Sequence, residues 1–159
     1  MGPLVTHAAC ARVLGVIERA RHEASGRLLT GGHRLDGPLA AGYFVAPTVF
    51  GDVDDTSDLA VNEVFGPVLS IMRFRDEDDV VERANRSEFG LAAYVYTRDA
   101  ARAHRLARRL HVGAVTVNAY PFLSPTAPFG GHKQSGFGRE GGRVGIDEFL
   151  QRKNVLMGL

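Results

Sequence analysis

The sequence has no tryptophan and only one cysteine, Cys10. A lone cysteine cannot form a disulfide within the chain, which excludes a disulfide-stabilised secreted domain and suits a reducing compartment. No apolar run approaches the roughly 18 residues that a membrane-spanning helix needs. The N-terminus also lacks the charged segment and apolar run of a secretory signal. We therefore expect a cytoplasmic protein without membrane contact.

The chain also has little excess charge. Its net charge is +1, so nothing indicates a polybasic or polyacidic partner, and nucleic-acid binding is not expected. Hydrophobic residues make up 45% and charged residues 23%, the usual balance of a globular protein. A chain of 159 residues can form one domain that buries roughly 68–70% of its unfolded surface.

Common catalytic and metal-binding patterns are missing as well. The six histidines form neither an i,i+4 pair nor a pair with C-x-x-C spacing, so no zinc site is expected. No Walker A loop and no strand followed by G-x-G-x-x-G is present. Cys10 lies in a helical pattern among alanines, without a basic neighbour that would lower its thiol pKa, so we assign it a structural role.

Hydrophobic periodicity indicates mixed α/β structure. Helices are expected after Thr6, after Asp76, after Asp99 and around residues 144–150, and strands at residues 27–30, 43–45, 48–50, 68–74, 91–97, 114–117 and 153–157. The three strands between residues 68 and 117 alternate with two helices, which predicts a parallel sheet. Sites in such sheets form at the carboxyl ends of strands, where Asn118 and the loop after it lie.

The most unusual segment runs from Pro128 to Glu140 and contains four glycines and a lysine. Glycine loses the most backbone entropy on ordering, so clustered glycines usually serve positive φ or close backbone approach. A flexible linker is the alternative, but linkers rarely carry two phenylalanines, here Phe129 and Phe137. The composition favours an ordered loop.

A second candidate segment contains Glu63 and Phe65, followed by Gly66 and Pro67. A carboxylate can accept hydrogen bonds from ribose hydroxyls, and an aromatic ring can pack on a flat heterocycle. The plain alternative is that Glu63 is a solvated loop acid and Phe65 a core residue. Spacing alone favours this alternative.

Three segments together resemble the NAD(P)-dependent aldehyde dehydrogenase superfamily. They are residues 63–68 (EVFGPV), residues 89–99 (FGLAAYVYTRD) and residues 128–140 (PFGGHKQSGFGRE). Residues 2–5 and 42–48 also resemble family segments in the expected order. The resemblance covers nearly the whole chain and implies an α/β parallel-sheet fragment of the catalytic domain.

The resemblance further implies a location at the C-terminal third of a full enzyme. Residues 1–150 would be the end of the catalytic domain, and residues 151–159 an oligomerisation strand. The nucleotide-binding domain and the glycine-flanked nucleophilic cysteine of the family have no match here. Cys10 lies on the wrong side of the segment at residues 2–5 to be that nucleophile.

Family roles then fall on individual positions. The resemblance implies that Glu63 binds the nicotinamide ribose of NAD or NADP and that Phe65 packs near the nicotinamide ring. It implies that Tyr120, Leu123 and Phe129 line the substrate tunnel. It places Glu140 as an acid near the proton path. Pro121 and Leu123 make the tunnel wall apolar, which favours an apolar aldehyde.

The expected function is therefore that of part of an enzyme. A complete family member oxidises an aldehyde to a carboxylic acid with NAD(P)+ through a cysteine thiohemiacetal. Nucleophile and general base act together in such chemistry, so the chain alone is expected to be inactive. One alternative is a non-catalytic oligomerisation module that associates with a full-length relative, and another is a degraded gene product. Exposed strands also predict a dimer or aggregate. The expected protein partner is another copy of the chain, in a homo-oligomer, or the missing N-terminal half.

Overall fold

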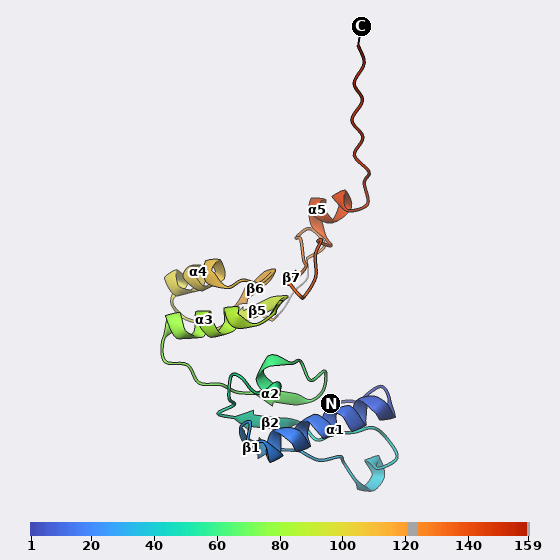
Figure 1. The fold of residues 1–159 in the computed structure, drawn as a ribbon, viewed down its shortest axis with the longest axis vertical. Helices are drawn as coiled ribbons and strands as arrows, with labels where there is room; N and C mark the ends of the chain where they lie inside the picture. Colours follow the sequence, from blue (N-terminus) through green and yellow to red (C-terminus); the bar gives the residue numbers. More distant parts are fainter. Residues whose placement is uncertain (121–123, 159) are drawn as a thin grey trace. The chain divides into compact units, whose positions relative to one another are not determined.

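The computed structural model describes residues 1–120 and 124–158, and the chain divides into two compact units, 1–75 and 76–159 (Figure 1). Each unit has its own helices and sheet pairs. The residues of each unit contact one another more than they contact the other unit. The expected boundary between residues 1–150 and 151–159 follows the family resemblance and stays a prediction.

The first unit packs one long helix on a small sheet. Helix α1 (His7–His22) begins at Thr6, whose hydroxyl accepts a hydrogen bond from the Ala9 amide at 3.1 Å, as expected for an N-cap. Strands β1 (Arg27–Thr30), β2 (Thr48–Gly51) and β3 (Val68–Ser70) lie in the order β1-β2-β3. The β1-β2 pair is antiparallel and the β2-β3 pair parallel. A 3₁₀ turn, η1 (Gly37–Leu39), and the short helix α2 (Asp58–Val61) complete the unit.

The core of the first unit lies between α1 and β2. The side chains that α1 buries recur at helical spacing, and they are Cys10, Val13, Val16, Ile17 and Ala20. Val13 and Ile17 are fully buried and belong to the same core cluster as Phe50 of β2, which is also fully buried. Cys10 is buried in this core, which agrees with the structural role expected from its helical pattern.

The second unit contains α3 (Glu77–Arg86), β4 (Phe89–Gly90), β5 (Ala92–Val95), α4 (Ala100–Arg109), β6 (Ala114–Val117), β7 (His132–Lys133) and α5 (Gly142–Asp147). Strands β5 and β6 are parallel and in register from the pair Ala92 and Ala114 to the pair Val95 and Val117. Helix α4 is the crossover between them. Strands β4 and β7 form a short antiparallel pair.

Helices α3 and α4 are joined by an ion-pair network around Glu77. Arg105 donates two hydrogen bonds of 3.0 Å to its carboxylate, and Arg102 and Arg109 lie at 3.4 and 3.8 Å. Hydrogen bonding from Arg105 lowers the pKa of Glu77. Asp76 and Asp99 cap the two helices as predicted, each accepting from a backbone amide three residues on.

The α/β fold class is confirmed, but three details of the sequence prediction are wrong. Strand β3 does not share a sheet with β5 and β6, because its ladder is with β2. Residues 43–45 form no strand, since only Val45 makes an isolated bridge, to Arg34. Residues 153–157 form no strand either, because no other described segment pairs with them.

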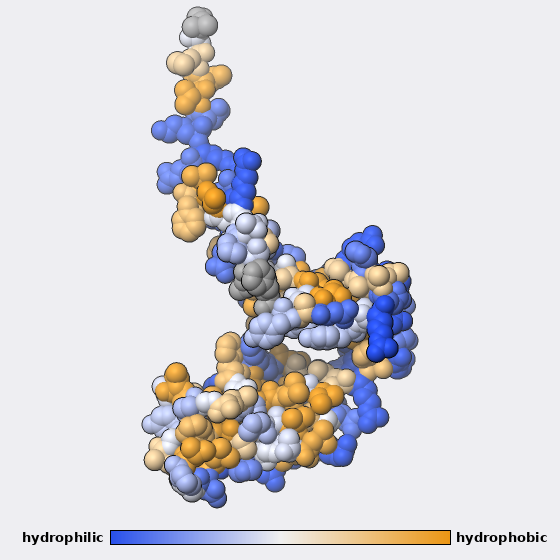
Figure 2. Space-filling view, turned by 180° about the vertical axis from the view of Figure 1, so that it is seen from behind, coloured by the Kyte–Doolittle hydropathy of each residue, from blue (hydrophilic) through white to orange (hydrophobic). Residues whose placement is uncertain are grey.

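The C-terminal segment 151–158 is extended and exposed. Figure 2 shows hydrophobic residues along it, and Val155, Leu156 and Met157 are all strongly exposed. A strand needs a partner for its backbone groups, so an oligomerisation role for this segment stays a prediction. Across residues 1–120 and 124–158, no helix is long and apolar enough to cross a membrane.

Candidate functional site

The first candidate segment, residues 62–67, connects α2 to β3 and is here named the cofactor loop. Its C-terminal end is fixed to the sheet, because the Pro67 carbonyl accepts a 2.8 Å hydrogen bond from the Thr48 amide. Gly66 lies against α1, where an added Cβ would stand 2.7 Å from Cγ2 of Val13. Because Val13 is fully buried, this end of the loop rests on the core of the first unit.

Phe65 is presented to solvent instead of joining the core. Its side chain is 72% exposed and its φ is +47°, in the left-handed region that a bulky residue rarely adopts. Glu63 is exposed on the same loop. The alternative reading of Phe65 as a core residue is therefore wrong, although the cofactor roles of Glu63 and Phe65 stay predictions.

Arg12 of α1 holds this conformation. Its guanidinium donates to the carbonyl of Val64 at 2.7 Å and to that of Phe65 at 3.3 Å. Arg12 was not predicted as a site residue. No local signal marks it, because its partners lie more than fifty residues away along the chain.

The second candidate segment, residues 128–140, is here named the signature loop. Phe129 and Glu140 form an isolated antiparallel bridge, with amide-to-carbonyl hydrogen bonds of 2.8 and 2.9 Å in the two directions. The structure therefore brings two predicted site residues together at the base of the loop. Phe129 is half-buried and Glu140 is exposed.

Two basic side chains fasten the signature loop. The Nζ atom of Lys133 donates to the carbonyls of Asn85 and Ser87, both at 2.9 Å, and so caps the C-terminus of α3. Arg139 donates to the carbonyls of Gly131 and Gly138 at 2.9 and 2.6 Å. These contacts connect the loop to α3 and to itself.

The glycines of the loop serve close backbone approach and positive φ. A Cβ at Gly131 would stand 2.5 Å from the Ser135 carbonyl oxygen, and one at Gly130 would stand 2.6 Å from that of Gly138. Gly136 and Gly138 both have positive φ. The prediction of an ordered loop, in preference to a flexible linker, is confirmed.

A small hollow of about 200 Å³ lies beside the base of the signature loop. Its lining consists of Ser124, Pro125, Ala127, Phe129, Glu140 and Gly141. It combines an apolar wall with one carboxylate, which suits a small, mostly apolar ligand next to a proton-transfer group. Tyr120 is 89% exposed, and Leu123 lies outside the described residues. The tunnel roles of Tyr120, Leu123 and Phe129 and the proton-path role of Glu140 stay predictions.

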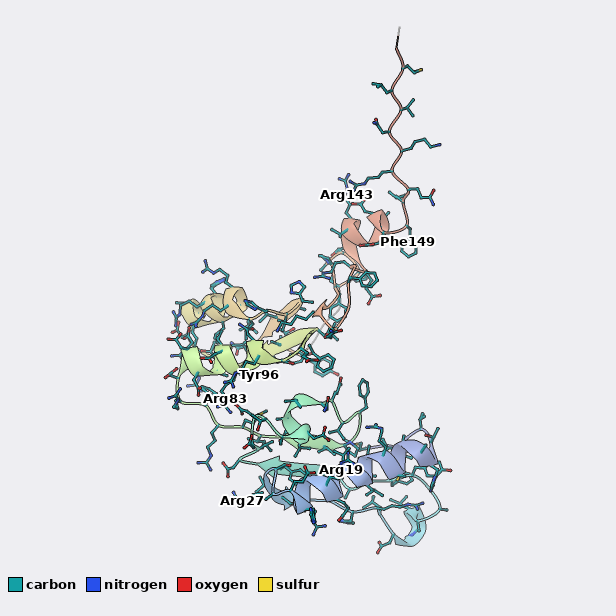
Figure 3. All side chains as sticks on the ribbon, viewed as in Figure 1. Arg19, Arg27, Arg83, Tyr96, Arg143 and Phe149 are labelled. Atoms are coloured by element: carbon teal, nitrogen blue, oxygen red, sulfur yellow. The ribbon has the colours of Figure 1, made fainter. Side chains whose placement is uncertain are left out.

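Asn118 occupies the carboxyl end of β6, as predicted. Its side chain donates to the Thr97 carbonyl at 2.7 Å and accepts from the Thr97 amide at 2.9 Å. The carboxamide thus continues the β5-β6 ladder where Asn118 itself turns into the left-handed region, with φ of +50°. An open hollow of about 600 Å³ borders this point, and its lining includes Tyr96, which is labelled in Figure 3.

The described residues contain no group of three histidine, cysteine or carboxylate side chains that could hold a metal ion. On the cofactor loop, Glu63 offers an exposed carboxylate and Phe65 an exposed aromatic face. These are the groups that a ribose and a flat heterocycle require.

Known proteins match this chain closely. The family model described as "Aldehyde dehydrogenase family" matches residues 1–155. A betaine aldehyde dehydrogenase of Cereibacter sphaeroides is 47% identical over the whole chain, which spans 32% of that relative. One of Rhizobium etli is 43% identical, again over the whole chain and 32% of the relative.

Solved structures of aldehyde dehydrogenases also resemble this chain. Mycobacterium tuberculosis aldehyde dehydrogenase, complexed with NAD+, has a TM-score of 0.93 at 41% identity, covering 99% of this chain and 32% of that one. The NAD+ complex of the Bacillus cereus aldehyde dehydrogenase has a TM-score of 0.87 at 43% identity, covering 94% and 30%. The chain thus spans about a third of the length of its relatives, and which third it represents stays a prediction. With its matched motifs and matched fold, the chain belongs to the aldehyde dehydrogenase family.

Proposed function

We propose that this chain supplies the nicotinamide-contacting loop and one substrate wall of an NAD(P)-dependent aldehyde dehydrogenase. In the complete enzyme an aldehyde is oxidised to a carboxylic acid, and NAD(P)+ accepts the hydride when bound. Glu63 accepts hydrogen bonds from the nicotinamide ribose, and Phe65 packs beside the ring. Phe129 lines the aldehyde site, and Glu140 holds a proton near it.

The observation that carries this proposal is the conformation of Phe65. A phenylalanine that is 72% exposed in a left-handed backbone is energetically costly, and such conformations cluster at functional sites, where the surrounding structure holds them. The loop around it is fastened to α1 and β2, so the aromatic face is presented from a rigid support. Glu63 lies two residues away on the same loop. The loop therefore offers an acceptor for the ribose and an aromatic face for the nicotinamide ring.

We further propose that the 159-residue chain does not turn over an aldehyde alone. Covalent catalysis needs an activated nucleophile in an accessible position. The single cysteine, Cys10, is 3% exposed and lies in the core cluster of the first unit. The nucleophile must therefore come from outside these residues.

A hybrid enzyme tests the proposal. The segment of the Cereibacter sphaeroides betaine aldehyde dehydrogenase that matches this chain is replaced by residues 1–159, and aldehyde-dependent NADH formation is measured. The hybrid should turn over, the isolated chain should not, and E63Q in the hybrid should raise the KM for NAD+. Turnover by the isolated chain, or an unchanged KM in E63Q, would contradict the proposal.

The hybrid also decides the substrate and the nucleotide. An apolar wall favours an apolar aldehyde. The relatives named above are betaine aldehyde dehydrogenases, and betaine aldehyde carries a quaternary ammonium group, which aromatic faces attract. Comparison of kcat/KM for the two kinds of aldehyde, and for NAD+ and NADP+, distinguishes these cases. Co-purification of the chain with an intact relative, without activity, would instead favour the non-catalytic oligomerisation module.

A further inference from the structure

We infer that Arg12 is a positioning residue for the nicotinamide half of the cofactor. This inference rests on the proposed function, because it concerns how the cofactor loop keeps Glu63 and Phe65 ready for NAD(P)+. Arg12 is exposed on α1, and its guanidinium donates to two carbonyls of the loop. It acts through the backbone of the loop.

The inference rests on the geometry of the two carbonyls that accept hydrogen bonds from Arg12. In an extended strand, successive carbonyls point in opposite directions, so one side chain cannot reach both. The carbonyls of Val64 and Phe65 nevertheless both accept from the guanidinium of Arg12, at 2.7 and 3.3 Å. The left-handed turn at Phe65, with φ of +47°, makes this convergence possible.

The same turn leaves the Phe65 side chain in solvent. Left-handed backbone is unfavourable for a bulky residue, so the conformation needs an external restraint. Arg12 supplies it, because its planar guanidinium presents several N–H groups in a fixed fork and each contact is charge-assisted. Without Arg12, the loop would relax and Glu63 and Phe65 would lose their fixed spacing.

The position of Arg12 on α1 is also fixed by the packing of the next residue. It is followed in α1 by Val13, which is fully buried and touches the space beside Gly66. The helix therefore contacts the cofactor loop through two adjacent residues, one by apolar packing and one by hydrogen bonding. Arg12 itself is exposed, so its replacement leaves the core intact.

The first test measures loop order in the full 159-residue chain by NMR relaxation. Amide order parameters at Val64 and Phe65 should be near 0.85 in the parent and should fall below about 0.6 in R12M. R12K, which offers a point charge in place of a fork, should give intermediate values. R21M is the matched control, since the guanidinium of Arg21 on the same helix pairs with Glu18, and it should not change the loop.

A second variant isolates the role of the left-handed turn. Glycine adopts positive φ without strain, so F65G should keep the carbonyls converged with less need for Arg12. Adding R12M to F65G should therefore change the order parameter at Val64 less than R12M alone does. Unchanged order parameters in R12M would overturn the inference.

The third test uses the hybrid enzyme. R12M should raise the KM for NAD+ about tenfold, the loss expected for a charge-assisted hydrogen bond, and leave the KM for the aldehyde unchanged. R12K should recover part of the loss and R21M should match the parent. A disordered loop with an unchanged KM for NAD+ would overturn the cofactor role of Arg12. A hybrid inactive with every residue intact would count against the proposed function, while the order parameters still decide the hold of Arg12 on the loop.

Discussion

Phe129 and Glu140 exchange both of their backbone hydrogen bonds across the base of the signature loop, at 2.8 and 2.9 Å. Residues paired in this way have Cα atoms about 5.5 Å apart and side chains on the same face. The predicted tunnel residue and the predicted acid are thus neighbours because of backbone pairing, whatever occupies the hollow beside them.

Gly113 should tolerate no side chain. A Cβ at this position would overlap the carbonyl oxygen of Gly130, so β6 and the signature loop could not keep their approach. G113A should lower the free energy of unfolding by about 2 kcal/mol or more, as strained backbone contacts do. Urea unfolding followed by circular dichroism measures this.

Gly15 provides the matched control for G113A. It lies within α1, and an added Cβ would stand 3.7 Å from Arg19 Nη1, an ordinary van der Waals contact. G15A should therefore stabilise the chain, by about 0.5–1 kcal/mol, through helix propensity. Equal losses in G15A and G113A would refute the packing argument.

Lys133 should stabilise the second unit through the end of α3. K133M removes two donors from the carbonyls of Asn85 and Ser87 and a positive charge from a helix C-terminus. We expect the free energy of unfolding to fall by about 1 kcal/mol at low salt. Added salt should make this difference from the parent smaller, because the Lys133 side chain is exposed and its charge is screened. K153M, in the extended tail, is the control and should leave the unfolding midpoint unchanged. A salt-independent effect in K133M would argue for lost packing.

Asn118 should be replaceable by neither alanine nor glycine. N118A loses two hydrogen bonds to Thr97 and places a Cβ-bearing residue without polar compensation at positive φ. N118G loses the same bonds but relieves the backbone, so it should cost less. We expect losses of about 2 and 1 kcal/mol in chemical unfolding. If N118G were the worse variant, backbone strain would not be part of the cost.

Acid should weaken the contact between α3 and α4. Hydrogen bonding from Arg105 lowers the pKa of Glu77 in the folded chain, so the folded state binds its proton less readily than the unfolded state. The stabilisation is therefore fully present above the unfolded pKa, near 4.5, and is lost as the pH falls through the lower folded value.

Unfolding midpoints measured across this pH range check the Glu77 effect. E77Q should be less stable than the parent at neutral pH, and the two should converge in acid. E82Q removes an acid of the same helix that forms a solvent-exposed ion pair with Arg86, and it should keep the slope of the parent. A parallel pH profile for E77Q and the parent would rule out the network as the cause.

Local signals in the sequence predicted much of this structure. Thr6, Asp76 and Asp99 cap helices because their side chains accept amide hydrogen bonds a few residues away. The glycines of the signature loop were correctly predicted to serve close approach. The wrong predictions concern pairing between distant segments. Strand β3 pairs with β2, and residues 153–157 pair with no other described segment, because strand pairing depends on which segments lie side by side in the fold.

For the candidate site, the motifs indicated Glu63, Phe65, Phe129 and Glu140, whose roles stay predictions. The structure pairs the last two through backbone hydrogen bonds. Arg12 and the capping role of Lys133 were invisible, because each acts on carbonyls more than forty residues away along the chain. A carbonyl has no side-chain identity, so no sequence pattern marks it as a partner.

The two-stranded parallel pair of β5 and β6 has a consequence for the life of the chain in a cell. Among the described residues, neither strand pairs with a third, so each offers a free row of amide and carbonyl groups. Such edges attract other strands and bind chaperones, and they expose a chain to proteases. With these edges uncovered, the chain should be depleted by aggregation and proteolysis, and a strand that pairs with β5 or β6 should raise its abundance.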